Sequence, residues 1–90
     1  MRRARSLGSF NRDRKRAERR GKDLAALEMV MHRLEFGERL EARFHDHKLR
    51  GQWEDYRECH IEGDWLLIYQ LAEDEIVFVR TGAHSDLFGG

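Results

Sequence analysis

The sequence predicts an α+β fold in which two helices pack on one face of an antiparallel sheet, in the order β-α-α-β-β-β. Three observations lead to this prediction: apolar residues at helical spacing over residues 24–34, a stop signal at Gly37, and period-two and apolar segments over residues 56–81. Helical periodicity followed by consecutive strands is typical of a two-layer α+β domain. A chain of 90 residues has room for one such domain, which we place at residues 1–90.

The first half of the chain is expected to hold an edge strand and two helices. Residues 3–7 fit a short strand, and Ser9 is a candidate N-cap for a helix that Gly21 ends. This helix is polar almost all round, so it needs a tertiary or intermolecular partner. A second helix is expected to begin after Asp23 and to end at Gly37. Its apolar stripe consists of Leu24, Leu27, Val30, Met31 and Leu34.

The second half of the chain is expected to form three consecutive strands. Residues 38–53 are interpreted as an irregular connection, and Gly63–Asp64 as a turn. The segment WLLIYQL is apolar on both faces through Tyr69, which indicates a central strand. The tail GAHSDLFGG is interpreted as a loop anchored by Leu87–Phe88. The strands are expected at residues 56–61, 65–71 and 76–81.

The charge of the chain is divided between its two halves. Residues 1–50 hold 15 basic and 8 acidic side chains, and residues 51–90 hold 2 basic and 9 acidic ones. A basic segment of this kind suits a phosphate backbone or an acidic protein partner, and it is also compatible with a solvated helix that has no partner. We assign the phosphate contacts of the basic helix to Arg14, Lys15 and Arg16.

Several classes of protein are excluded by composition. No apolar run approaches the roughly 20 residues that span a bilayer, and the basic N-terminus lacks the apolar core of a secretory signal. A cytoplasmic location without membrane contact is therefore expected. The single Cys59 forms no internal disulfide and is expected to be a small buried residue. His45 and His47 lack a third ligand at familiar spacing, so neither a metal nor another cofactor is expected.

Titratable side chains are expected to gather at one end of the sheet. His60 ends one strand, Asp64 begins the next, and Arg80 and His84 follow a strand that returns to the same end. His47 precedes the first of these strands. Two histidines can supply a general base and a general acid, a carboxylate can orient an imidazole, and an arginine can bind a phosphate.

Aromatic side chains near this end offer surfaces on which bases could stack, namely Tyr56, Trp65 and Phe88. Each is also compatible with a structural role, since Trp65 and Phe88 fit core anchors. The combined set indicates metal-independent RNA cleavage. In that reaction a base deprotonates the 2′-hydroxyl, the 2′-oxygen attacks phosphorus, and an acid protonates the leaving 5′-oxygen.

The second half of the chain resembles the YafQ branch of the RelE-type toxins, which are small bacterial toxins of type II toxin–antitoxin pairs. The runs HDHKLRGQWEDYRECHIEGDWLLIYQL and FVRTGAHSDLFG carry the resemblance over about residues 45–89. The matching positions are Asp46–His47, Leu49, Gly51, Trp53, Arg57, His60, Asp64–Trp65, Leu67–Ile68–Tyr69, Arg80–Thr81–Gly82, His84 and Leu87–Phe88. Lys48 and Gly63 stand where family members often carry proline, and both changes loosen loops that carry the expected site.

The resemblance implies the RelE-like fold and a ribosome-dependent endoribonuclease that cuts mRNA in the ribosomal A site. It places His84 as general acid and leaves the base open among His47, His60 and Asp64. It gives Arg80 a phosphate contact, adds Trp65 and Phe88 to the site, and gives the basic helix ribosomal RNA as a partner. It also implies a cognate antitoxin similar to RelB or DinJ.

Two other interpretations remain open from the sequence alone. One is a protein of the same fold without RNase activity, such as a gyrase-directed toxin or a subunit that only forms complexes. The other is a basic nucleic-acid-binding module, which would depend on residues 1–22 and be indifferent to His84.

Overall fold

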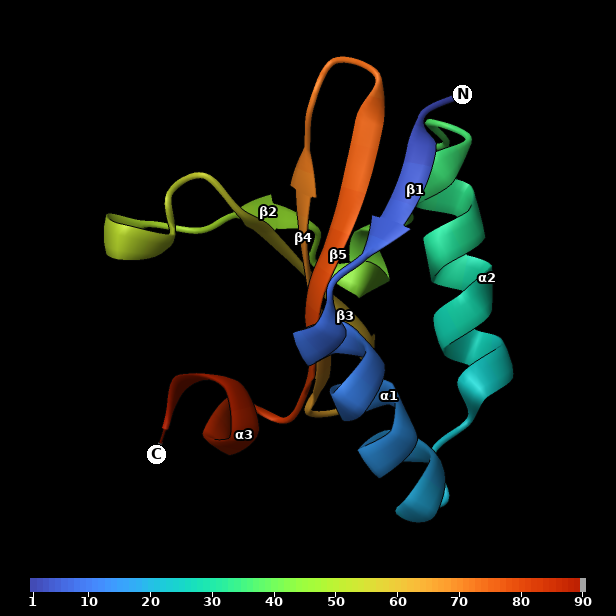
Figure 1. The fold of residues 1–90 in the computed structure, drawn as a ribbon, viewed down its shortest axis with the longest axis vertical. Helices are drawn as coiled ribbons and strands as arrows, with labels where there is room; N and C mark the ends of the chain where they lie inside the picture. The colour runs from blue at the N-terminus through green and yellow to red at the C-terminus, as the bar shows by residue number, and fades with distance from the viewer. Residues whose placement is uncertain (90) are drawn as a thin grey trace.

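The computed structural model describes residues 1–89 and contains a five-stranded sheet in the order β1-β5-β4-β3-β2 (Figure 1). The strands are β1 (Arg3–Ser6), β2 (His47–Lys48), β3 (Arg57–Glu62), β4 (Trp65–Leu71) and β5 (Glu75–Gly82). β1 runs parallel to β5, and the other neighbouring pairs are antiparallel. The α+β prediction is confirmed, and the sheet is mixed rather than wholly antiparallel.

β4 is the central strand because its side chains are apolar on both faces. Trp65, Leu67 and Tyr69 belong to the core beneath the helices, whereas Leu66 and Ile68 belong to a second cluster on the opposite face. All five side chains are at most 2% exposed. A strand covered on both faces needs no polar alternation, so the prediction for WLLIYQL is confirmed.

α2 (Leu24–Glu35) covers one face of the sheet together with the preceding helix (Figure 1). Its N-terminus is capped as predicted, because the Asp23 carboxylate accepts from the backbone N–H groups of Ala25 and Ala26. Its end is followed by Gly37 in the left-handed region, with φ 74°. The core side of α2 consists of buried Leu27, Val30 and Leu34, with Leu24 and Met31 partly buried.

α1 (Gly8–Arg19) packs against β5, which is the tertiary partner that its polar sequence requires. Phe10 is 1% exposed and lies 5.8 Å from Phe78, measured between ring centroids. Ser9 does not cap this helix, so that prediction is wrong. Leu7 occupies the N-cap position, and the Ser9 hydroxyl instead donates to the Val79 carbonyl at 2.7 Å, because helix and strand approach each other closely there.

Two short elements were missed by the sequence patterns. The tail predicted as a loop contains α3 (His84–Phe88), which begins where the Asp86 carboxylate accepts from the Ala83 backbone N–H at 3.0 Å. The segment His47–Lys48, predicted as part of a connection, pairs with β3. A strand of two residues, such as His47–Lys48, is too short to show an alternating pattern in the sequence. Within residues 1–89, no helix has the length and apolar character needed to cross a bilayer.

Candidate active site

The candidate active site lies on the face of the sheet that α1 and α2 leave uncovered. Along β3, Cys59 points into the core beneath the helices, and burial raises the pKa of its thiol. Glu58 and His60 point the other way, because they pair with Ile68 and Leu66 of the second cluster. α3 lies on this same side of the sheet (Figure 1). Cys59 is therefore a core residue, as predicted, and the titratable side chains of β3 face α3.

The structure brings together three of the predicted residues, His60, Asp64 and His84. The imidazole rings of His60 and His84 lie 6.1 Å apart, measured between centroids. The Asp64 carboxylate, in the turn between β3 and β4, lies 2.5 Å from Nδ1 of His84. The Phe88 ring, one turn along α3, lies 6.2 Å from the His84 ring. One turn and one short helix thus carry the carboxylate and imidazole to the side of His60.

The contact between Asp64 and His84 fixes which imidazole nitrogen is available to a substrate. Hydrogen bonds from His84 lower the pKa of Asp64, so this carboxylate is ionised at neutral pH and can only accept. Nδ1 of His84 must then carry the hydrogen, and Nε2 is free to exchange a proton with a substrate. Both side chains remain accessible, with 55% of His84 and 63% of Asp64 exposed.

The turn that carries Asp64 depends on glycine. Gly63 has φ 51°, in the left-handed region. Proline is fixed near −65°, so it cannot adopt this conformation. The β3–β4 turn of this chain therefore differs in backbone from a turn built around proline.

Glu58 is a site residue that the sequence patterns did not single out. Its carboxylate lies 3.3 Å from Nε2 of His60, and its side chain is only 6% exposed. A buried carboxylate in contact with one nitrogen of an imidazole orients the ring. The signal in the sequence that could have identified Glu58 was its spacing from His60, since residues 58 and 60 share one face of a strand.

His45 is a second addition to the site. Its ring lies 5.3 Å from that of His60, and its backbone is left-handed, with φ 48°. Such a conformation is uncommon for a non-glycine residue and often accompanies function. The neighbouring His47 is held through its Nδ1, which lies 2.6 Å from the His45 carbonyl oxygen. No group of three or more His, Cys, Asp or Glu side chains in residues 1–89 is arranged to hold a metal ion.

A part-buried polar cluster fixes the loop that carries His45 and His47. The Tyr69 hydroxyl of β4 donates to the Asp46 carboxylate, and Arg57 of β3 lies 3.4 Å from the other oxygen of the same carboxylate. Burial, followed by the hydrogen bond to Asp46, raises the pKa of Tyr69, so its hydroxyl stays protonated. Asp46 therefore ties this loop to two strands of the sheet.

Two predicted residues lie in a different environment from the histidines. Arg80 donates through Nε to Asp13 of α1 at 2.6 Å, and this hydrogen bond raises the pKa of Arg80. Trp65 is 2% exposed, and its indole N–H donates to the Thr81 hydroxyl at 2.8 Å. The Arg80 side chain is 28% exposed. Trp65 thus serves the core, whereas Phe88, at 38% exposed, offers a ring to solvent.

The predicted basic set on α1 is divided between two sides of the helix. Arg14 pairs with Glu28 of α2, and Lys15 lines the same shallow surface. Arg16 lies on the other side, 3.2 Å from Asp13 and near the start of α3. The three residues are consecutive in the sequence, which hides this division. Consecutive residues of an α-helix point in different directions, so the helix places them on different sides.

Comparison with known proteins supports the resemblance over the whole chain. The mRNA interferase toxin YafQ of Escherichia coli strain K12 is 42% identical over 83 residues, which cover 91% of this chain and 90% of that protein. The E. coli DinJ–YafQ toxin–antitoxin complex contains a chain with TM-score 0.90 and 40% identity, covering 98% of each chain. A metal-bound toxin from Helicobacter pylori gives TM-score 0.91 and 37% identity, covering 98% of this chain and 100% of that one.

The family model for the bacterial toxin of type II toxin–antitoxin systems, YafQ, matches residues 2–89. The match includes the first half of the chain, whereas the resemblance seen in the sequence covered about residues 45–89. The predicted family is confirmed: the chain belongs to the YafQ family of bacterial toxins of type II toxin–antitoxin systems.

Proposed function

We propose that the protein is a ribosome-dependent endoribonuclease that cuts mRNA in the A site by metal-independent acid–base chemistry. The relative named mRNA interferase supports RNA as the substrate class. The observation that carries the proposal is the pairing of each of two neighbouring imidazoles with its own carboxylate, His84 with Asp64 and His60 with Glu58.

The two pairs suit different roles in the reaction. Asp64 is engaged by His84, so we assign the general base to His60, whose ring Glu58 orients. His60 takes the proton of the 2′-hydroxyl, the 2′-oxygen forms a bond to phosphorus, and the bond from phosphorus to the 5′-oxygen breaks. His84, whose ring Asp64 holds through Nδ1, gives its Nε2 proton to the leaving 5′-oxygen. The products are a 2′,3′-cyclic phosphate and a 5′-hydroxyl.

Three further residues complete the proposed substrate site. Phe88 offers an exposed ring beside His84, on which a base can stack. Arg80 is assigned a phosphate contact, since its side chain keeps some exposure while Asp13 holds it. Trp65 is assigned a supporting role, because its ring is buried. We assign His47 to the margin of the site, since its ring contacts the His45 carbonyl.

The proposed partners follow from the family and from charge. A DinJ-like antitoxin is proposed because the E. coli relative is found in a DinJ complex. Ribosomal RNA is proposed as the partner of the basic helix through Arg14, Lys15 and Arg16, because cationic side chains on a helix suit a phosphate backbone. A ribosome-bound substrate would place the activity in the cytoplasm.

The experiment is induced expression in a bacterium of the wild type, His84→Ala and His32→Ala, with growth recorded and mRNA 5′ ends mapped. His32 is an exposed histidine of α2 and provides a matched control. We expect growth arrest and new cuts with the wild type and with His32→Ala, and neither with His84→Ala. Equal arrest by all three without new mRNA ends would indicate a toxin with another target and would contradict the proposal.

A further inference from the structure

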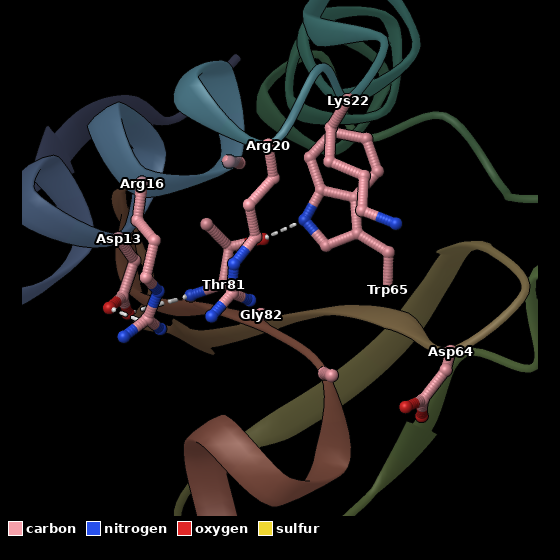
Figure 2. Close-up of a pocket in the computed structure, with 10 residues that line it drawn as sticks. Asp13, Arg16, Arg20, Lys22, Asp64, Trp65, Thr81 and Gly82 are labelled. Atoms are coloured by element: carbon pink, nitrogen blue, oxygen red, sulfur yellow. Dashed lines mark hydrogen bonds and ion pairs between the residues drawn. The ribbon is translucent and has the colours of Figure 1, made fainter.

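A pocket of about 270 Å³ lies beside the proposed active site, between the C-terminal half of α1, the start of β4 and the junction of β5 with α3 (Figure 2). Ala83 lines it and directly precedes His84, and Asp64 lines it while contacting the His84 imidazole. The pocket therefore adjoins the place where the cut phosphate is proposed to bind. Its volume is just under the range of about 300–1,000 Å³ for sites that hold drug-sized ligands, which suits one nucleotide unit.

The back of the pocket is closed by two buried side chains, Trp65 at 2% and Ala17 at 6% exposed. The Trp65 indole N–H donates to the Thr81 hydroxyl. The backbone at Gly82 is closely surrounded, because a Cβ there would lie 3.1 Å from Cβ of Asp86 and 3.3 Å from an Arg16 nitrogen. A side chain at residue 82 would therefore displace the groups that shape the pocket.

The pocket also has three cationic side chains in its lining, together with two acids. Arg16, Arg20 and Lys22 lie beside Asp13 and Asp64 in this lining (Figure 2). Arg20 is 49% exposed and lies 2.8 Å from Asp86, whereas Arg16 lies 3.9 Å from the same carboxylate. The hydrogen bond from Arg20 lowers the pKa of Asp86 to about 2, so this acid is ionised at neutral pH. An exposed arginine held by one carboxylate can turn to a phosphate at little cost.

We propose that this pocket is a subsite for the substrate phosphate that follows or precedes the cut one, bound by Arg20 and Lys22. The inference rests on the proposed nuclease function and deepens it. A phosphate of the substrate strand is favoured over an acidic peptide because the pocket adjoins the pair of His84 and Asp64 and is itself lined by Asp64.

The test is multiple-turnover cleavage on an excess of ribosomes programmed with a defined mRNA, measured as KM and kcat. The double variant Arg20→Ala/Lys22→Ala is compared with Arg12→Ala/Arg19→Ala, which removes the same charge from exposed positions of α1 outside the pocket. Loss of charge-assisted phosphate contacts is expected to raise KM by about 10- to 100-fold in the pocket variant. The control pair should show only a small, salt-dependent rise.

A second arm tests for the phosphate. A neutral methylphosphonate in place of the phosphate next to the cut one should raise KM for the wild type and have less effect on the pocket variant, because interacting groups are not additive. Arg20→Lys/Lys22→Arg, which keeps both charges, should recover most of the affinity. Circular dichroism and thermal melting check that each variant folds.

The other outcomes overturn the subsite and separate it from the nuclease proposal. Equal KM increases in the pocket and control variants would show general electrostatics without a subsite. Unchanged KM together with weaker antitoxin binding in the pocket variant would assign the pocket to an acidic segment of the protein partner. Absence of cleavage by the wild type would contradict the nuclease function itself, and the subsite with it.

Discussion

Asp13 is the buried acid that joins α1 to the end of β5, and its removal should destabilise the fold strongly. The carboxylate is 6% exposed and accepts from Arg80 at 2.6 and 3.2 Å, from the Thr81 backbone N–H at 3.1 Å and from Arg16 at 3.2 Å. Asp13→Ala leaves the Thr81 N–H buried without a partner, which lowers the free energy of unfolding by about 1–3 kcal/mol. It also removes charged hydrogen bonds of about 1.5–3 kcal/mol each, which water at partly exposed Arg80 partly replaces.

We therefore expect Asp13→Ala to lower the free energy of unfolding by about 3–5 kcal/mol, the range for breaking a buried ion pair. Asp13→Asn should cost less, because the amide oxygen can still accept from the Thr81 N–H. Asp23→Ala provides the comparison, since an N-cap is worth about 1 kcal/mol. Urea unfolding followed by circular dichroism measures all three, in a His84→Ala background that allows production. A loss for Asp13→Ala no larger than that for Asp23→Ala would refute the reasoning.

Three further predictions concern the site and its supports. Asparagine can adopt the left-handed backbone of residue 45, so His45→Asn removes only the ring beside His60. Single-turnover cleavage should slow by about tenfold. An unchanged rate would show that His45 is not part of the site. The pKa of Asp86 is about 2 in the folded protein, against an ordinary 3.8. Ionised Asp86 therefore adds to the free energy of unfolding above about pH 4, and this contribution is lost as pH falls toward 2. Asp86→Asn should therefore show a smaller acid-dependent loss in urea titrations at pH 2–5, and an identical pH profile would contradict this. Arg14→Glu with Lys15→Glu should weaken co-sedimentation with ribosomes and leave kcat near the wild-type value, whereas a loss in kcat alone would place these residues elsewhere in the mechanism.

The sequence predicted the elements whose signals are long or chemically marked. The stripe of α2, its Asp23 cap and the apolar run of β4 each extend over enough residues to separate period 3.6 from period two. α3 was missed because five residues, three polar followed by two apolar, show no periodicity. The Ser9 cap failed for a different reason, since a nearby strand carbonyl competed for the hydroxyl.

The candidate site was predictable only where neighbouring residues share a turn or a strand. Hairpin geometry placed His60 near Asp64, and strand direction returned His84 to the same end of the sheet. The pairing of Arg80 with Asp13 was not predictable, because it joins residues 67 positions apart. The Glu58 contact required knowing which face of β3 is buried, and that depends on where the helices pack.

The most direct test of the proposed mechanism is the chemistry of the ends of the cut mRNA. Programmed ribosomes are incubated with the wild type and with His84→Ala, and the 3′ end of the upstream fragment is analysed by mass spectrometry. The account predicts a 2′,3′-cyclic phosphate and a downstream 5′-hydroxyl, formed about 10²- to 10⁴-fold more slowly by His84→Ala. An mRNA with a 2′-deoxy sugar at the cut position should remain intact. A free 3′-hydroxyl with a downstream 5′-phosphate, or cleavage of the deoxy substrate, would contradict attack by the 2′-oxygen and with it the roles of His60 and His84.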